Sequence, residues 1–222
     1  MNKLDYSKVC CFTGHRPERL DLPEYKVIGW LEEQIDKAIA DGYTDFISGT
    51  QRGVDIWAAE IVLKKKAEGK NVRLICAAPW DGVESRWEFG WKKRYKYIMT
   101  NADEIYYISK TPGRKAFFER NHWMVDRSSM LIAAFTGAPG GTKETIDYAE
   151  KKGLEVREMP RNLQGELICF QKKKRLNLKS LKHAKTAVTS MSETALTELC
   201  ISVILTTDRA CVSERLKNPV CL

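Results

Sequence analysis

The amino-acid sequence predicts an α/β protein: a Rossmann-like, doubly wound and mainly parallel sheet with helices on both faces, plus a C-terminal appendage. Two observations predict this fold class. Short, almost continuously apolar segments alternate with amphipathic helical patterns along residues 1–160, and strands that are covered on both faces have this composition. The alternation repeats five times, which implies parallel strands joined by helical crossovers.

The expected strands are short apolar segments that end at glycine, proline or polar residues. They cover residues 8–14 (KVCCFTG), 45–50 (DFISGT), 72–79 (VRLICAAP), 104–109 (EIYYIS), 129–137 (SMLIAAFTG) and 154–159 (LEVREM). Cys10 and Cys11 are neighbours on the first strand and are expected on opposite faces, as small buried thiols that do not bond each other.

Between these segments, apolar residues recur at helical spacing. Three helices are expected from this spacing, each with one apolar face. The first has Ile28, Leu31, Ile35 and Ile39 on that face, and the second, within 53–68, has Ile56, Ala59, Leu63 and Ala67. The third has Trp87, Trp91, Tyr95 and Ile98 or Met99. A fourth helix is expected over 119–127. A fifth is expected to start near Thr142 and to end before Gly153, which is a typical C-cap glycine.

Charge and composition exclude several classes of protein. No run of eighteen apolar residues is present, and the N-terminus lacks the apolar segment of a signal peptide, so we expect no membrane span and a cytoplasmic protein. The seven cysteines form no C-x-x-C pair. A zinc site built from Cys10, Cys11 and His15 lacks ligand spacing, and we expect neither a metal nor a cofactor.

The positive charge is concentrated after residue 160. The net charge of the chain is +8, of which residues 161–222 carry +6 and residues 1–160 only +2. We therefore expect a Rossmann-like domain over 1–160 and a basic, poorly ordered appendage over 161–222. Nucleic acid is a partner only if the basic appendage binds it, and a homo-oligomer is left open.

The loop after the first expected strand is unusual, because Gly14 is followed by His15 and Arg16. Glycine lets the backbone approach a ligand, and a guanidinium binds phosphate or carboxylate through its planar fork. In an open parallel sheet, ligands bind beyond the carboxyl ends of the strands. The alternative is a plain turn whose arginine pairs with a nearby acid.

Two further loops share this character. The segment SGTQRGVD supplies five candidate ligand-binding residues as the chain enters a helix: Ser48, Gly49, Arg52, Gly53 and Asp55. The segment TGAPGGTKET, residues 136–145, supplies Gly140, Gly141 and Thr142 at a helix start, where backbone N–H groups favour an anion. Asp55 can also act as a helix cap. We expect the three loops to meet at one edge of the sheet.

A fourth stretch, FFERNHWMVDRSS, carries Glu119, Arg120, Asn121 and Arg127. Helical spacing would place Arg120 and Arg127 on similar sides of one helix. Either arginine could face the crevice and complete a charged pocket, with Asn121 beside it. Both could instead form surface ion pairs, which stabilise a protein little.

Taken together, the segments FTGHRP, SGTQRGVD, ERNHWMVDRSSMLIA and GGTKETIDYAEKKG resemble the SLOG superfamily, most closely its YpsA-type branch. The superfamily includes the Smf/DprA DNA-processing proteins and the LOG enzymes. The resemblance covers about residues 8–158 and implies a Rossmann-like fold that binds a nucleotide or a nucleotide-derived molecule. It leaves the appendage unexplained.

LOG enzymes are phosphoribohydrolases with the signatures M-H-x-R-K and P-G-G-x-G-T-x-x-E. The first corresponds here to residues 124–128, which keep Arg127 but lack the histidine and lysine. In the second, Lys143 replaces the third glycine and Asp147 replaces the glutamate. These departures favour a nucleotide-binding sensor that holds an ADP-ribose-like molecule.

Two other functions stay open. In a nucleoside-monophosphate N-glycosidase, Asp147 or Glu119 would be the catalytic carboxylate and Arg127 would orient it. In a DNA-binding or DNA-processing protein, the basic appendage would contact the phosphates.

Overall fold

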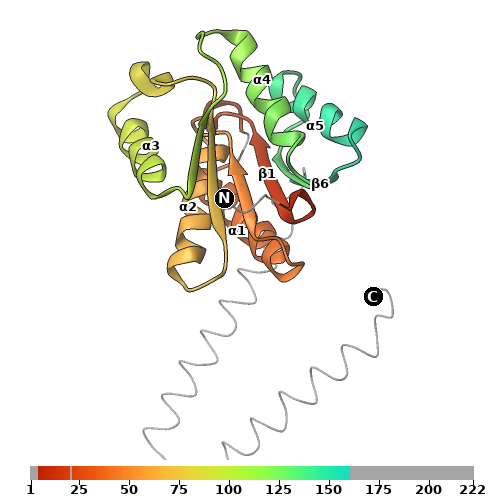
Figure 1. The fold of residues 1–222 in the computed structure, drawn as a ribbon. Coiled ribbons are helices and arrows are strands. Elements are labelled where there is room, and N and C mark those ends of the chain that lie inside the picture. The colour runs from red at the N-terminus through yellow and green to blue at the C-terminus, as the bar shows by residue number, and fades with distance from the viewer. Residues whose placement is uncertain (1–4, 21, 161–222) are drawn as a thin grey trace, which may run out of the picture. The chain divides into compact units, whose positions relative to one another are not determined.

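The structure is a computed structural model that describes residues 5–20 and 22–160. A six-stranded, fully parallel sheet crosses the molecule in the order β4-β3-β2-β1-β5-β6 (Figure 1). The strands are β1 (Val9–Gly14), β2 (Asp45–Ser48), β3 (Arg73–Ala78), β4 (Glu104–Tyr107), β5 (Met130–Ala134) and β6 (Glu155–Glu158). The predicted fold class is confirmed, whereas the expected appendage lies outside the described residues.

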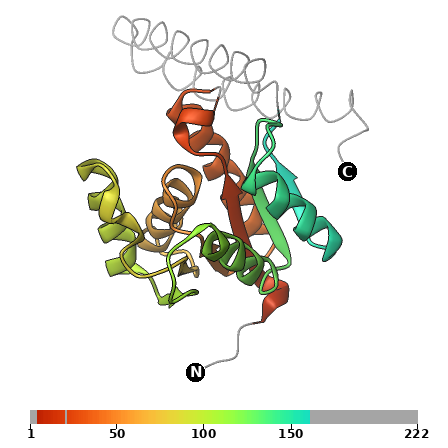
Figure 2. The same cartoon turned by 90° about the horizontal axis from the view of Figure 1, so that it is seen from above.

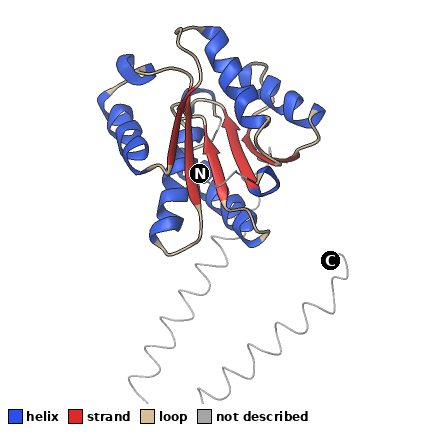
Figure 3. Ribbon diagram, viewed as in Figure 1, coloured by secondary structure: helices blue, strands red, loops and turns tan. Residues whose placement is uncertain are grey.

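Five helices connect these strands and cover the sheet (Figure 3). They are α1 (Glu24–Ala40), α2 (Val54–Ala67), α3 (Phe89–Asn101), α4 (Arg114–Val125) and α5 (Gly141–Lys151), with 3-10 turns η1 (Tyr6–Lys8), η2 (Pro17–Arg19) and η3 (Val83–Arg86). Helix α2 contacts both α1 and α3, and α4 packs on α5. The chain thus forms three layers, with α1 to α3 on one face of the sheet and α4 and α5 on the other (Figure 2).

The two faces of β1 enter different halves of the core. Cys11 belongs to the cluster beneath α4 and α5, which also contains Met124 and Ile146. On the opposite face, the Phe12 ring stacks on the Phe46 ring with centroids 6.1 Å apart. Cys10 and Cys11 are buried and free, as expected, and burial raises the pKa of the Cys11 thiol to about 12.

Two helices begin where the sequence pattern did not place them. The fourth begins at Arg114, five residues earlier than predicted, because it starts directly after Gly113, which has a φ of 153°. It ends at Val125, so Arg127 lies beyond the helix and the predicted shared face with Arg120 is wrong. The third begins at Phe89, since the backbone of Trp87 is extended (ψ 160°).

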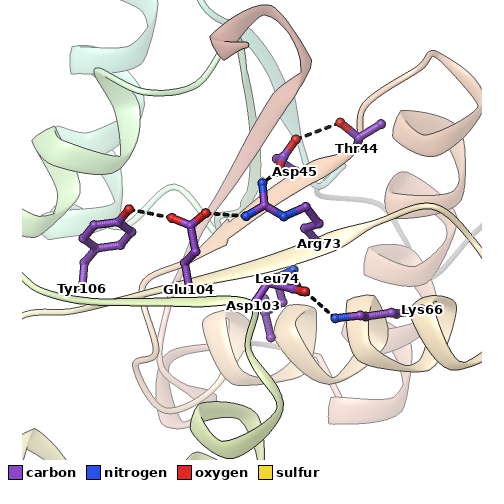
Figure 4. A network of polar contacts seen from close by, with 8 residues as sticks. All are labelled: Thr44, Asp45, Lys66, Arg73, Leu74, Asp103, Glu104 and Tyr106. Atoms are coloured by element: carbon purple, nitrogen blue, oxygen red, sulfur yellow. Dashed lines mark hydrogen bonds and ion pairs between the residues drawn. The ribbon is translucent and has the colours of Figure 1, made fainter. Parts of the chain in front are cut away.

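An ion-pair network joins β2, β3 and β4 at the amino edge of the sheet (Figure 4). Arg73 donates to Asp45 at 3.0 Å and also to Glu104, which accepts a further hydrogen bond from the hydroxyl of Tyr106 at 2.5 Å. Beside it, Asp103 accepts a hydrogen bond from the Leu74 backbone N–H at 2.9 Å. Charges at the strand starts therefore reinforce the parallel register.

We expect the substitution Glu104→Gln to weaken this network in a pH-dependent way. The Tyr106 hydroxyl, together with Arg73, lowers the pKa of Glu104 below its ordinary value. Its stabilising contribution is therefore complete above the unfolded-state pKa near 4.3 and is lost as pH falls through the lower folded-state value. Urea denaturation should show a loss of about 1 kcal/mol at pH 7 that shrinks near pH 3.

The matched control is Glu33→Gln, because within residues 5–20 and 22–160 the only ion pair of Glu33 is an exposed one with Lys37 on α1. A loss in Glu104→Gln that is the same at both pH values would contradict the assigned role of the carboxylate.

Candidate functional site

The strand order reverses at β1, which pairs with β2 on one side and with β5 on the other. Beyond the carboxyl ends of these strands lies a pocket of about 360 Å³, which is the position where open α/β sheets bind ligands. Its lining comprises Phe12, Thr13, Gly14, His15, Arg16, Arg19, Gln51, Asp55, Phe117, Arg120, Asn121, Gly141 and Thr142. Segments far apart in the sequence therefore meet at one sheet edge, as predicted.

His15 closes the pocket between β1 and β5. Its backbone N–H donates to the Ala134 carbonyl at 3.2 Å, and its Nδ1 is 2.9 Å from the hydroxyl of Thr136. Its ring packs edge-on against Phe135, with centroids 5.3 Å apart. The imidazole is buried and held on several sides, whereas the adjacent Arg16 is exposed at the rim.

A buried ion pair forms the floor of the pocket. Arg120 on α4 is 5% exposed and Asp55 on α2 is 7% exposed. The Nη1 group of Arg120 donates to Asp55 Oδ2 at 3.1 Å and to the Gly49 carbonyl. Among the described residues, Arg120 Nε has no hydrogen-bond partner. One N–H of the guanidinium is thus buried without a partner, on a residue that lines the pocket.

Burial dominates the electrostatics of this pair. Loss of hydration raises the pKa of Asp55, and the charge of Arg120 opposes that rise. The same burial lowers the pKa of Arg120, with Asp55 acting against it. Because an arginine in a protein stays protonated, the guanidinium keeps its charge and holds the Asp55 carboxylate ionised.

The loop after β2 is built around this pair. Ser48 donates its hydroxyl to the Asp55 carbonyl at 2.7 Å, and the Gln51 N–H donates to Asp55 Oδ2 at 3.2 Å. A Cβ on Gly49 would lie 1.7 Å from Arg120 Nη1, so only glycine fits there. Asp55 therefore organises the loop that precedes α2, and no side chain caps the start of that helix.

Other predicted glycines also have packing reasons. A Cβ on Gly14 would lie 2.4 Å from the Val54 side chain, so glycine lets the end of β1 approach α2. Gly53 has a φ of 95°, and a Cβ there would meet Pro17. These contacts pack the first two loops together and do not by themselves require a ligand.

The third loop meets the first through Arg19. Its Nη2 donates to the Pro139 carbonyl at 3.2 Å, and a Cβ on Gly140 would lie 3.4 Å from its Nη1. At the start of α5, no side chain caps the helix, and Gly141 and Thr142 line the pocket. Asn121 on α4 donates to Thr145 at 2.8 Å, which joins the two helices.

Several predicted site residues do not line the pocket. Arg52 pairs with Glu18 at 3.2 Å, and Glu119 pairs with Lys115 at 3.5 Å. Asp147 is exposed and pairs with Lys143. Arg127 lies before β5, at the amino edge of the sheet, with its guanidinium 4.3 Å from the centroid of the Trp123 ring. Ser48, Gly49, Gly53 and Gly140 support the loops from outside the lining.

Sequence reasoning missed Arg19, Gln51, Phe117 and Thr136 as parts of the site. Arg19 follows Arg16 by one 3-10 turn, and Thr136 opens the predicted third loop, so both had a signal in the sequence. Gln51 lies inside the predicted second loop and had the same signal, whereas Phe117 had none beyond its place at the start of the fourth stretch. Phe117 reaches the pocket only because α4 begins at Arg114 and crosses back over the sheet.

A larger hollow, of about 490 Å³, lies between η3, α3 and the end of β4. Asp81, Glu84, Lys92 and Lys96 contribute both signs of charge to its lining. It contains none of the glycine-rich loops and lies away from the switch point, so we place the candidate site at the smaller pocket.

Residues 5–20 and 22–160 contain no cluster of three metal-binding side chains and no helix able to cross a membrane.

Comparison with known proteins identifies the family. The protein-family model YpsA, described as the YspA SLOG family, matches residues 10–163. The chain therefore belongs to this family. A UPF0398 protein of Bacillus cereus strain G9842 is 26% identical over 155 residues, which cover 66% of this chain and 84% of that protein. A UPF0398 protein of Halalkalibacterium halodurans is 29% identical, with coverage of 65% and 82%.

Two solved structures have a similar fold. DNA processing protein A from Helicobacter pylori, described with a single-stranded DNA binding mode, has a TM-score of 0.51 at 20% identity, and the match covers 74% of this chain and 73% of that one. DNA processing protein A from Streptococcus pneumoniae has a TM-score of 0.52 at 19% identity. That match covers 73% of this chain and 56% of the other.

We expect Arg120→Met to destabilise the protein by about 3–5 kcal/mol, because it leaves the Asp55 carboxylate buried without its partner. The loss should shrink as pH falls, since a carboxyl whose folded-state pKa is raised destabilises only where it is ionised. Adding Asp55→Asn should recover part of the loss. Urea denaturation of the three proteins between pH 4 and pH 7 measures both effects.

Arg127→Met is the matched control, because Arg127 is half-buried just beyond the same helix. Its guanidinium donates to the Trp123 carbonyl and lies over the Trp123 ring, and it forms no ion pair with any residue that the structure describes. An equal loss in both methionine variants would show that the buried pair has no special role.

Proposed function

We propose that this SLOG protein binds a nucleotide or nucleotide-derived ligand in the pocket at the carboxyl edge of the sheet. One observation carries the proposal: Arg16, Arg19 and Arg120 line a single hollow with the start of α5. Among the described residues, Asp55 is the one carboxylate that shares this lining, and it is already bound to Arg120. The pocket therefore has positive charge to offer to an anion.

The phosphate would lie at the N-terminus of α5. The first backbone N–H groups of a helix have no partner within the helix, and the helix dipole favours negative charge there. Gly141 carries no side chain that would shield them, and a Cβ at this position would meet no atom within 4 Å. Arg19, which is fixed to the Pro139 carbonyl, would supply a guanidinium fork beside that phosphate.

The base and ribose would extend toward α4. Phe117 gives the pocket an apolar wall and is itself supported by the Trp80 ring, with centroids 5.1 Å apart. An aromatic face that stacks on a base and a volume above 300 Å³ suit a ligand of nucleotide size. An ADP-ribose-like molecule, with anionic and aromatic parts, fits this distribution of groups.

Binding is favoured over N-glycosidase chemistry by the positions of the carboxylates. Asp147 and Glu119, which that reaction would use, are absent from the pocket lining and pair with lysines on their own helices. A general acid or nucleophile must lie within hydrogen-bond reach of the reacting atoms. Release of free base from a nucleoside monophosphate would reverse this preference.

Single-stranded DNA is the second candidate ligand. It is favoured by the fold shared with DNA processing protein A. The basic segment 161–222, which was expected to support DNA binding, lies outside the described residues.

Isothermal titration of the full chain against AMP, ADP, ATP, ADP-ribose, NAD and a single-stranded oligonucleotide tests the proposal. We expect a nucleotide to bind, and Arg19→Gln to weaken binding by about tenfold or more, because a charge-assisted contact to phosphate is lost. Arg86→Gln removes the same charge from exposed η3 and is the matched control. A folded protein that binds no nucleotide contradicts the proposal, and oligonucleotide binding alone would favour the DNA alternative.

A second test separates ligand binding from stability at the start of α5. Gly141→Asp places a carboxylate where the phosphate is expected, so it should reduce nucleotide binding by about tenfold or more. The same carboxylate should leave stability unchanged or raise it by about 0.3–1 kcal/mol through the helix dipole. Gly141→Asn, of equal size and no charge, should retain most of the binding, and equal affinities of the two variants would place the phosphate elsewhere.

A further inference from the structure

The two edges of the sheet differ sharply. The last strand, β6, has charged side chains at three of its four positions, and Arg157 pairs with both Glu155 and Asp41. The other edge, β4, exposes 42% of Ile105, 36% of Tyr106 and 50% of Tyr107. Natural proteins protect free sheet edges with charges, proline or bulges, because an open edge can pair with another strand. Strand β6 has such protection, whereas the exposed part of β4 has none.

Exposed apolar side chains gather at this end of the molecule. Seven large apolar side chains are exposed among the described residues, and five of them lie on β4 or on α3, which leads directly into it. These five are Phe89, Tyr97, Ile105, Tyr106 and Tyr107. Figure 1 shows α3 at the end of the sheet away from α5 and β6. A concentration of this kind is typical of a protein–protein interface.

We propose that two copies of this chain associate through β4, with their free edges paired antiparallel about a two-fold axis. The charges at the two ends of β4 favour pairing with a second β4 strand that runs in the opposite direction. Glu104 stands at its start and Lys110 follows its end, so antiparallel pairing brings opposite charges together. Parallel pairing in register would bring like charges together, which is unfavourable.

The side-chain faces select the register. Tyr106 lies on the α4 side of the sheet, where its ring is 4.9 Å from that of Trp123, and Ile108 packs on the same core. Tyr107 lies on the other side, where it lines the hollow with α3. Opposed residues of an antiparallel pair must share a face. In one register, Tyr107 lies opposite the Tyr107 of a second copy, so Tyr106 lies opposite Ile108 and Glu104 lies opposite Lys110. In each of these pairs both residues lie on the same face of the sheet, and the charged pair has opposite signs.

Sedimentation velocity of the full chain over a concentration series tests the proposal. We expect a monomer–dimer equilibrium. The double substitution Ile105→Lys with Tyr107→Lys should weaken association by about tenfold or more, because the new lysine at 107 would face its own copy across the axis and the one at 105 would lie diagonally from it. Tyr25→Lys is the matched control, since Tyr25 is 61% exposed on α1, outside the cluster. Circular dichroism establishes that each variant is folded.

A cysteine at the axis tests the register without adding charge. Tyr107→Cys should form an intermolecular disulfide under mild oxidation, because residues opposed on an axis bring their Cβ atoms within disulfide range. Tyr97→Cys, exposed on α3, should not, and the unsubstituted chain reports any link made by the native cysteines. A wild-type chain that stays monomeric at every concentration overturns the proposal. So does a dimer that survives the two lysines and fails to link through residue 107.

Discussion

The desolvated contact between Arg120 and Asp55 is the interaction on which the candidate site depends. The two groups come from helices on opposite faces of the sheet, α4 and α2, and they meet beyond the strand ends. Neither charge is tolerable alone in that position, because burial removes the hydration of both. The pair therefore holds the loop after β2 against α4, and it sets the floor of the pocket.

The same contact explains the glycine-rich character of the second loop. Gly49 presents its carbonyl to the guanidinium and has no room for a Cβ. Thr50, the next residue, has a φ of 58°, which is uncommon for a residue with a side chain. The backbone is shaped here by a buried arginine. A glycine-rich loop between a strand and a helix thus need not touch a phosphate. Among the pocket-lining glycines of the three loops, Gly141 in the third loop is the one at which a Cβ would meet no atom within 4 Å.

The total charge of this domain does not reveal where its charged and apolar side chains gather. Residues 1–160 are almost balanced in total, yet arginines collect at the switch point and exposed apolar side chains collect at β4 and α3. A balanced total allows both features, because each depends on which side chains the topology brings together. The proposed ligand site and the proposed contact between copies lie on different parts of the sheet, one beyond the end of β1 and the other along the edge of β4.

The sequence by itself determined the strands, the parallel fold class and the meeting of the loops at one edge, because apolar runs and helical spacing are local signals that packing did not override. It also located Gly14 to Arg16 and Gly141 to Thr142 in the pocket. Only the tertiary structure decided between Arg120 and Arg127, since α4 ends at Val125 and leaves Arg127 at the opposite edge. It likewise brought Phe117 and Arg19 to the site and removed Asp147 from it. Those outcomes depend on where a helix starts and how it crosses the sheet, and residue spacing along the chain does not contain that information.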